Sequence, residues 1–148
     1  DNASEVCKSV NLGDIIIATD AESDSNYIVA NEYNVKPIAS EKLLQVAKEV
    51  SSNMDNVKVG TIFTSDTFYT EHSILERLSK TDVMGVEMET FALYTNAKVA
   101  NKNALAMFTV TDKLLRGISV PAQDRLTGLN AMITLALEVA VKLEKDKE

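Results

Sequence analysis

The chain has 148 residues, the length of one ordinary domain, and its 45% hydrophobic and 25% charged residues are sufficient for a packed core. Its 22 acidic residues outnumber its 15 basic ones, and the resulting net charge of −7 argues against a general nucleic-acid or membrane binder. A single cysteine, Cys7, and a single histidine, His72, exclude a disulfide framework and leave little material for a metal site. We expect a globular protein of a reducing compartment.

One domain is expected over residues 1–148, because the five glycines and two prolines are scattered and no linker interrupts the sequence. No apolar run approaches the ~20 residues of a membrane span, and no basic-then-apolar signal peptide opens the chain. The chain starts at Asp1 rather than Met, so we expect a fragment of a longer protein or a processed product.

The first half of the chain predicts two strands separated by one helix. Residues 14–19 form a β-branched run typical of a buried strand, whereas residues 26–38 are interpreted as a loop with some extended chain. Ser40 is a typical helix N-cap, and apolar residues recur at helical spacing over 43–50. Residues 57–63 predict the second strand, which ends in a polar Thr-Ser-Asp sequence.

The second half continues the alternation of helices and strands. Residues 70–78 predict a helix with one apolar face, and residues 83–88 predict a short strand. A helix over 89–100 and an apolar strand over 104–110 follow. From 123 to 144, apolar residues recur every three or four positions, which predicts a long amphipathic helix.

This alternation, with nearly continuous apolar strands, predicts an α/β fold with a mixed, mainly parallel sheet covered by helices. Ligands of such sheets bind at the carboxyl ends of strands. Polar clusters follow three predicted strands, at residues 65–69, 87–89 and 109–112. We therefore expect a functional site where these three strand ends meet.

Glu87 and Glu89 are the first candidates for that site. Residues two apart on a strand share a face, so both carboxylates can point into one cleft and accept hydrogen bonds from the vicinal hydroxyls of a sugar. The alternative is that Glu89 opens a helix and interacts favourably with its dipole, while Glu87 is solvated.

Asp112 follows an apolar strand, where partial desolvation favours the protonated carboxyl and suits a general acid, although Asp also commonly caps a turn there. Arg125 can pair with an acid or be an ordinary surface cation. Phe68 and Tyr69 follow a strand end, where an aromatic ring can stack on a planar ligand or pack in the core. His72 has no obvious partner.

Four ordered blocks resemble the nucleoside phosphorylase-I family, and more closely its bacterial hexameric purine branch. Residues 85–94, G-V-E-M-E-T-F-A-L-Y, resemble the family's V-E-M-E signature. Residues 63–69 are similar to its F-S-A-D-x-F-Y block and residues 108–112 to its C-T-V-S-D block, and Arg125 matches the arginine that opens its last helix. V-E-M-E alone is shared with nucleosidases and uridine phosphorylases, and the other blocks point to the purine branch.

The resemblance implies a phosphorylase/hydrolase-like, three-layer α-β-α fold, of which this chain is the C-terminal portion. It implies phosphorolysis of the N-glycosidic bond of purine (deoxy)ribonucleosides to free base and (deoxy)ribose 1-phosphate, in cytoplasmic purine salvage. Inorganic phosphate is then a co-substrate, and no metal or other cofactor is expected. A homo-oligomer, a hexamer by resemblance, or an N-terminal partner segment is expected to complete the enzyme.

The resemblance also assigns residues to the nucleoside. Phe68 would stack near the purine, and Val86 would line the base pocket. Met88 and Glu89 would hold the ribose, with Glu89 accepting from its hydroxyls. Glu87 would lie at the junction of sugar and base.

By the same resemblance, Asp112 would protonate the purine at N7 and make the base a better leaving group. Arg125 would help Asp112 act as an acid when the site closes. Thr111 stands where the family has a serine. Glycosidic cleavage passes through an oxocarbenium-like cation, so leaving-group protonation and ribose positioning lower the barrier without a metal.

The main departure from the family is the missing phosphate site. The only arginines are Arg77, Arg116 and Arg125, and none lies on a glycine-rich loop, while residues 1–9 and 113–123 also differ from the family pattern. Two other functions therefore stay open: a nucleosidase that uses water, and an inactive fragment or assembly module. A truncated sheet exposes edges and apolar surface, which predicts self-association or an N-terminal partner.

Overall fold

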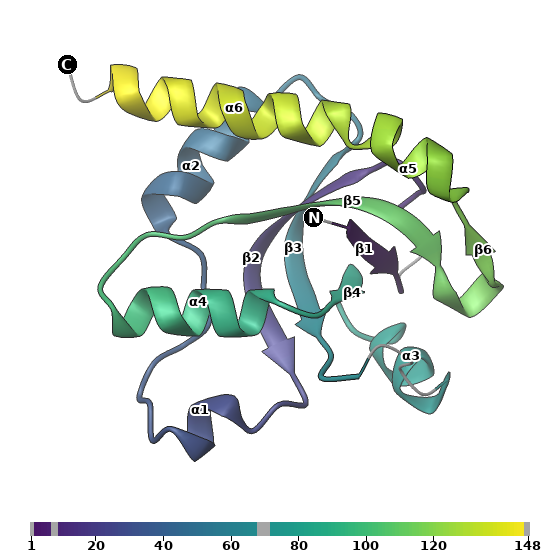
Figure 1. Ribbon diagram of the computed structural model, residues 1–148, viewed down its shortest axis with the longest axis horizontal. Helices are drawn as coiled ribbons and strands as arrows, with labels where there is room; N and C mark the ends of the chain where they lie inside the picture. The colour runs from purple at the N-terminus through teal and green to yellow at the C-terminus, as the bar shows by residue number, and fades with distance from the viewer. Residues whose placement is uncertain (1, 7–8, 68–71, 147–148) are drawn as a thin grey trace.

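The computed structural model describes residues 2–6, 9–67 and 72–146, and its strands and helices alternate along the chain (Figure 1). In chain order the elements are β1 (Asn2–Glu5), β2 (Ile15–Ser23), α1 (Tyr27–Ala30), α2 (Glu41–Val50), β3 (Val57–Thr64), α3 (His72–Leu78), β4 (Gly85–Glu87), α4 (Thr90–Val99), β5 (Ala106–Lys113), a 3₁₀ turn (Leu114–Arg116), β6 (Ile118–Ser119), α5 (Ala122–Gly128) and α6 (Asn130–Lys145).

The four predicted strands and the predicted helices are present, with differences at their ends. Ser40 caps α2 as predicted, its hydroxyl accepting from the Leu43 amide at 3.5 Å. The loop predicted over 26–38 contains the short helix α1. The single long helix predicted over 123–144 is divided into α5 and α6 at Leu129.

Two strands, β1 and β6, were not predicted. β1 has the mostly polar sequence N-A-S-E and owes its conformation to pairing with a neighbour on each side. β6 returns along the end of β5 through a tight turn at Gly117, whose φ of +62° is in the region that glycine adopts readily. This pairing also extends β5 beyond its predicted end.

The sheet is mixed and nearly closed on itself. Its strand order is β1-β4-β3-β2-β5-β6, and β1 pairs with β5 as well as with β4, which completes a ring. The β2–β3, β3–β4 and β1–β5 pairs are parallel, and the other described pairs are antiparallel. In the described sheet β6 pairs with β5 alone, whereas β1 has a neighbour on each side, and the predicted self-association or partner stays a prediction.

Gly85 allows β1 to approach β4 closely. A Cβ atom at this position would lie 3.1 Å from the Ser4 carbonyl oxygen and 3.2 Å from the Cδ1 atoms of Ile16 and Ile62. Close backbone approach is a common reason for glycine within a strand. The contact matters for the site, because β1 separates β4 from β5 there.

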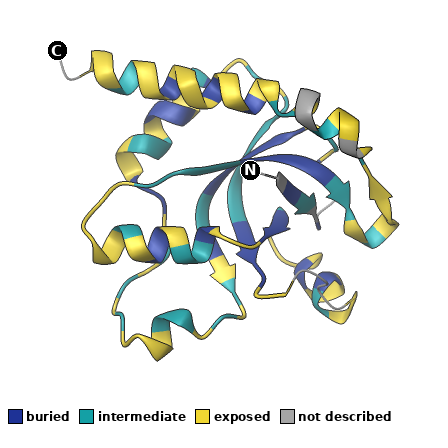
Figure 2. Cartoon of the chain, in the orientation of Figure 1, coloured by how far each residue is buried: buried dark blue, intermediate teal, exposed yellow. Residues whose placement is uncertain are grey.

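Both faces of β2 are buried, which establishes the three layers. Ile15 and Ile17 pack toward α2 and α6, whereas Ile16 and Ala18 pack toward α4 on the opposite face. Figure 2 shows the dark, buried strands between these helices. A third cluster, under α3, contains Val6, Phe63, Leu75, Leu78, Val83 and Val86.

Tyr94 of α4 joins two strands of the sheet. Its hydroxyl donates to the Ala18 carbonyl at 2.7 Å and accepts from the Ala106 amide at 2.9 Å. Burial, assisted by the negative charges of Glu87 and Asp20, raises the pKa of Tyr94 to about 12. The neutral phenol therefore acts as a fixed bridge at the end of the β2–β5 pairing.

The segment Gln123–Lys145 is long and apolar enough to cross a membrane by length and composition, which corrects the expectation that no stretch approaches a membrane span. A core helix of a soluble protein passes the same test. The α6 part of this segment buries Met132, Leu135 and Val139 against the sheet and α2, while 19% of its apolar window as a whole is buried.

Candidate functional site

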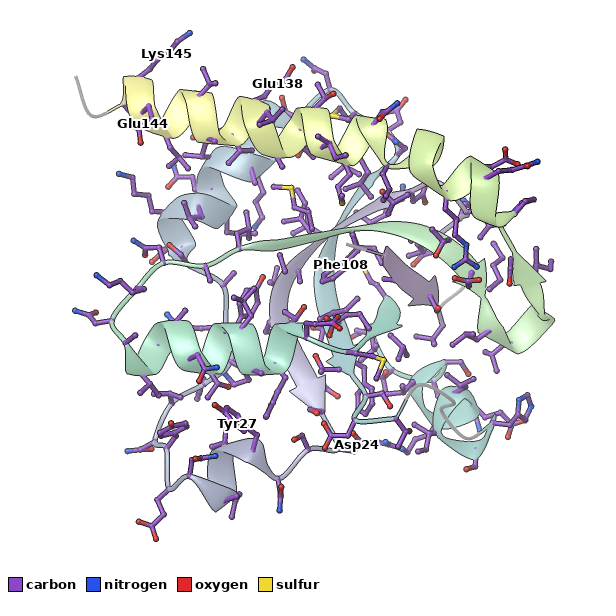
Figure 3. All side chains as sticks on the ribbon, in the orientation of Figure 1. Asp24, Tyr27, Phe108, Glu138, Glu144 and Lys145 are labelled. Atoms are coloured by element: carbon purple, nitrogen blue, oxygen red, sulfur yellow. The ribbon has the colours of Figure 1, made fainter. Side chains whose placement is uncertain are left out.

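The carboxyl ends of β3 and β4 lie side by side, as predicted from their polar residues. Thr64 is the register partner of Glu87, and the Ser65 amide donates to the Glu87 carbonyl at 2.8 Å. The end of β2 joins them, because the Ser23 hydroxyl donates to the Thr64 carbonyl at 2.7 Å. Asp24, labelled in Figure 3 beyond the end of β2, accepts from the Asp66 amide at 3.3 Å.

The sequence analysis did not select Ser23 or Asp24. The available signal was their position directly after a buried β-branched run, which is where an α/β sheet binds its ligands. The predicted strand stopped at residue 19, whereas β2 continues to Ser23. A register shift between Ala18 and Ala21 interrupts the simple strand pattern there.

Glu87 is buried, and its carboxylate is fully occupied by the protein. One oxygen, Oε1, accepts from the Thr64 hydroxyl. The other, Oε2, accepts from the Glu89 amide at 2.9 Å, the Thr90 amide at 2.8 Å and the Thr90 hydroxyl at 2.7 Å. The interpretation of Glu87 as a solvated residue is therefore wrong: it fixes the N-terminus of α4, where amide donors and the helix dipole favour a negative charge.

Met88 and Glu89 lie on the surface at the turn between β4 and α4. Glu89 is the N-cap residue of α4, as the alternative interpretation expected, and its Oε2 accepts from the Met88 amide at 3.3 Å. Met88 is 40% exposed. Both side chains are accessible to a ligand, whereas the neighbouring Glu87 is held inside.

Val86 and Phe68 are the two residues predicted to contact the base. Val86 is buried with Phe63 in the cluster under α3, so its role in a base pocket stays a prediction. Phe68, the predicted stacking residue, lies outside the described residues.

Asp112 and Arg125 form an ion pair, which confirms the predicted pairing of this arginine with an acid. Arg125 Nη2 lies 3.0 Å from Asp112 Oδ1, and Arg125 Nε donates to the Val120 carbonyl at 3.0 Å. The buried Thr111 hydroxyl donates to the other oxygen, Asp112 Oδ2, at 2.7 Å. The side chains of Asp112 and Arg125 are 17% and 37% exposed, so the pair is reachable from solvent.

Strand β1 brings the two parts of the site together. Ser4 pairs with Val86 on one side and with Asp112 on the other. Two strand spacings put the backbones of Val86 and Asp112 roughly 10 Å apart. The Met88–Glu89 turn and the Asp112–Arg125 pair therefore flank the same short strand.

Within the described ranges, no group of three histidine, cysteine, aspartate or glutamate side chains is arranged to hold a metal ion. Arg125 is engaged by Asp112, and the other two arginines are exposed on α3 and on the 3₁₀ turn. The polar groups of the site are thus carboxylates, hydroxyls and one paired guanidinium, which suit a hydroxyl-rich neutral ligand.

Comparison with known proteins identifies the family and the fold of the chain. A family model described as the phosphorylase superfamily matches residues 6–142. The chain belongs to the phosphorylase superfamily. Its curated relatives include DeoD-type purine nucleoside phosphorylases from Anoxybacillus flavithermus, 38% identical over 138 residues, and from a Geobacillus species, 40% identical over 139 residues. These matches cover 91% and 92% of this chain but only 59% of each relative.

Solved phosphorylase structures share the fold. The P. knowlesi homologue of the P. falciparum PNP superposes with a TM-score of 0.79 at 23% identity, covering 98% of this chain and 60% of that one. A uridine phosphorylase from Vibrio fischeri gives 0.77 at 21% identity, covering 95% and 61%. The predicted fold class is confirmed, and this chain spans about three-fifths of its phosphorylase relatives.

Proposed function

We propose that this chain is the C-terminal portion, and a single domain, of a cytoplasmic purine nucleoside phosphorylase. The observation that supports this most is the Asp112–Arg125 pair lying across β1 from the exposed Met88–Glu89 turn. The Anoxybacillus and Geobacillus relatives are named as purine nucleoside phosphorylases, and the sequence carries the blocks that resemble the purine branch at these positions.

In this proposal the nucleoside lies over β1. The Glu89 carboxylate accepts hydrogen bonds from the ribose hydroxyls, and Met88 packs against the sugar. Glu87 keeps its contacts with Thr64 and Thr90 and holds this turn in place. A fixed turn orients the ribose for attack at its anomeric carbon, which lowers the entropic part of the barrier.

On the other side of β1, Asp112 donates a proton to N7 of the purine as the glycosidic bond breaks. The electron pair of that bond leaves with the base, and a phosphate oxygen bonds to the ribosyl cation. General acid catalysis of this kind contributes about 10²–10⁴-fold. Arg125 orients Asp112 and is itself held by the Val120 carbonyl, while the buried Thr111 hydroxyl donates to the other Asp112 oxygen.

The test is phosphorolysis of inosine and adenosine by the native protein that contains this chain, with phosphate concentration varied. Asp112→Asn is expected to lower kcat by about 10²-fold or more, because it removes the proton donor. Asp55→Asn, on the exposed turn before β3, is the matched control. Wild-type rates for Asp112→Asn on both substrates would refute the assignment.

A nucleoside-binding or assembly module is the second candidate. It is favoured by the arginines of the chain, because Arg125 is paired with Asp112 and the other two arginines are exposed on α3 and on the 3₁₀ turn. Nucleoside binding without turnover at any phosphate concentration would support this module. Turnover that does not depend on phosphate would instead indicate a nucleosidase.

A further inference from the structure

Ser4 of β1 lies between the two parts of the proposed nucleoside site. It is the register partner of Val86 on β4 and of Asp112 on β5, the strands on either side of β1 (Figure 1). Neighbouring strands lie about 4.8 Å apart, so the Ser4 backbone is roughly 5 Å from each partner. Neither the sequence motifs nor the resemblance to the family assigns a role to this serine.

The side chain of Ser4 points to the same side of the sheet as that of Val86. Register partners on adjacent strands share a face, and side chains alternate along a strand. Ala3, directly before Ser4, packs in the cluster beside α4, whereas Val6, two residues after Ser4, packs with Val86 in the cluster under α3. Ser4 is itself half-buried. Its hydroxyl is therefore accessible beside the buried Val86.

An irregularity in the pairing of β1 with β5 brings Asp112 opposite Ser4. Ala3 pairs with the residue two positions before Asp112, and the register shift after Ala3 skips Thr111. Such irregularities commonly re-aim a side chain beside a site. The two Asp112 oxygens accept from Arg125 and from Thr111. Among the described residues none hydrogen-bonds the Ser4 hydroxyl, so it is available to a ligand.

A nucleoside in the proposed pose presents one particular edge of its base to Ser4. Asp112 faces N7 of the purine, and the Met88–Glu89 turn holds the ribose, which is bonded to N9. In the five-membered ring of a purine, C8 is the atom that joins N7 to N9. Because Ser4 lies between Asp112 and the strand that leads into the turn, C8 lies nearest to its hydroxyl.

An unsubstituted purine offers the Ser4 hydroxyl only a weak partner, because C8 carries a hydrogen and a C–H group is a poor donor. The bound base covers β1 and displaces water, and a polar group left without a partner in such a place lowers affinity. An amino group at C8 would donate to the hydroxyl, since a serine oxygen accepts as well as donates. A methyl group of nearly the same size would not.

We propose that Ser4 determines which group the site accepts at C8, and that it favours purine nucleosides with a hydrogen-bonding substituent there over those with an apolar one of equal size. The inference rests on the proposed function, because that function orients the base over β1. Ser119 of β6 provides the contrast. It pairs with Asp112 on the other side, is exposed, and lies away from the Met88–Glu89 turn.

The experiment measures the dissociation constants of 8-aminoinosine and 8-methylinosine by isothermal titration calorimetry, with the native protein that contains this chain. Ser4→Ala removes the hydroxyl, and Ser4→Cys replaces it with a thiol of similar size that hydrogen-bonds weakly. Ser119→Ala is the matched control, because it removes a hydroxyl from the other neighbour of Asp112. All three substitutions keep the backbone pairing of their strands, and thermal unfolding checks that the variants fold.

We expect the wild type to bind 8-aminoinosine more tightly than 8-methylinosine. Ser4→Ala and Ser4→Cys should each reduce this preference about 3–10-fold, the contribution of one neutral hydrogen bond, and Ser119→Ala should leave it unchanged. Three results would overturn the inference: a preference that survives both Ser4 variants, a preference reduced equally by Ser119→Ala, or binding of inosine without binding of either analogue.

Turnover of inosine with phosphate, followed in the same preparations, reports the proposed function separately. A Ser4-dependent preference without turnover would refute the reaction and support the role of Ser4. Turnover that depends on Asp112, without a Ser4-dependent preference, would support the reaction and refute the role of Ser4. The absence of any nucleoside binding would overturn both.

Discussion

Replacing Thr64 with valine tests whether the buried Glu87 carboxylate organises the site. The Thr64 hydroxyl donates to Glu87 Oε1 and accepts from the Phe91 amide at 3.0 Å, so it connects β3, β4 and the first turn of α4. Valine has nearly the same shape and lacks both bonds. A hydrogen bond to a charged group contributes about 1.5–3 kcal/mol, and an unsatisfied buried amide costs about 1–3 kcal/mol. We therefore expect Thr64→Val to lower the free energy of unfolding by roughly 2–4 kcal/mol.

The assay is equilibrium unfolding in urea, with Thr64→Ser as the control that keeps the hydroxyl. Hydrogen exchange of the Glu89 and Thr90 amides measures how firmly the Glu87 carboxylate is held, because both amides donate to it. Faster exchange of these two amides is expected in Thr64→Val but not in Thr64→Ser. If valine and serine destabilise equally, or if the exchange rates are unchanged, the reasoning about this network is wrong.

Three further predictions concern the groups that hold the site's elements together. Gly85→Ala is expected to cost about 1–3 kcal/mol in urea unfolding, because its methyl would crowd the Ser4 carbonyl and loosen β1; full stability would refute the close-approach argument. The raised pKa of Tyr94 means that the folded state holds the phenol proton more tightly, so stability is full below pH 10 and is lost as pH rises toward 12, by up to about 2–3 kcal/mol. Tyr94→Phe should remove that part of the pH dependence, which unfolding curves between pH 9 and about 12 would detect. Arg125→Lys is expected to lower kcat more than it raises KM in the native protein, because it disturbs the orientation of Asp112; an effect confined to KM would contradict a positioning role.

Three of the predicted site residues lie near β1 but belong to three separate elements. Glu89 follows β4 as the N-cap of α4, Asp112 lies near the end of β5, and Arg125 lies in the last turn of α5. Among the described residues, the arginine beside them, Arg125, is engaged by Asp112.

Local patterns in the sequence were sufficient for the elements whose stability depends on their own residues. The β-branched run of β2, the Ser40 cap of α2 and the polar strand ends after β3 and β4 all follow from side-chain shape, capping and burial. The resemblance to the family also suggested that Arg125 acts on Asp112, and the two residues form an ion pair in the structure. The spacing of the two residues in the sequence does not indicate this contact.

The position of β1 and the role of Glu87 depend on contacts made in the folded protein. The polar β1 carries no strand pattern, and it is extended because β4 and β5 satisfy its backbone on both sides. Glu87 resembles a surface carboxylate in the sequence, yet donors from Thr64 of another strand and from the first turn of α4 make its burial favourable. Both outcomes depend on hydrogen-bond partners distant in the sequence, because a polar group is stable in the interior only where such partners converge.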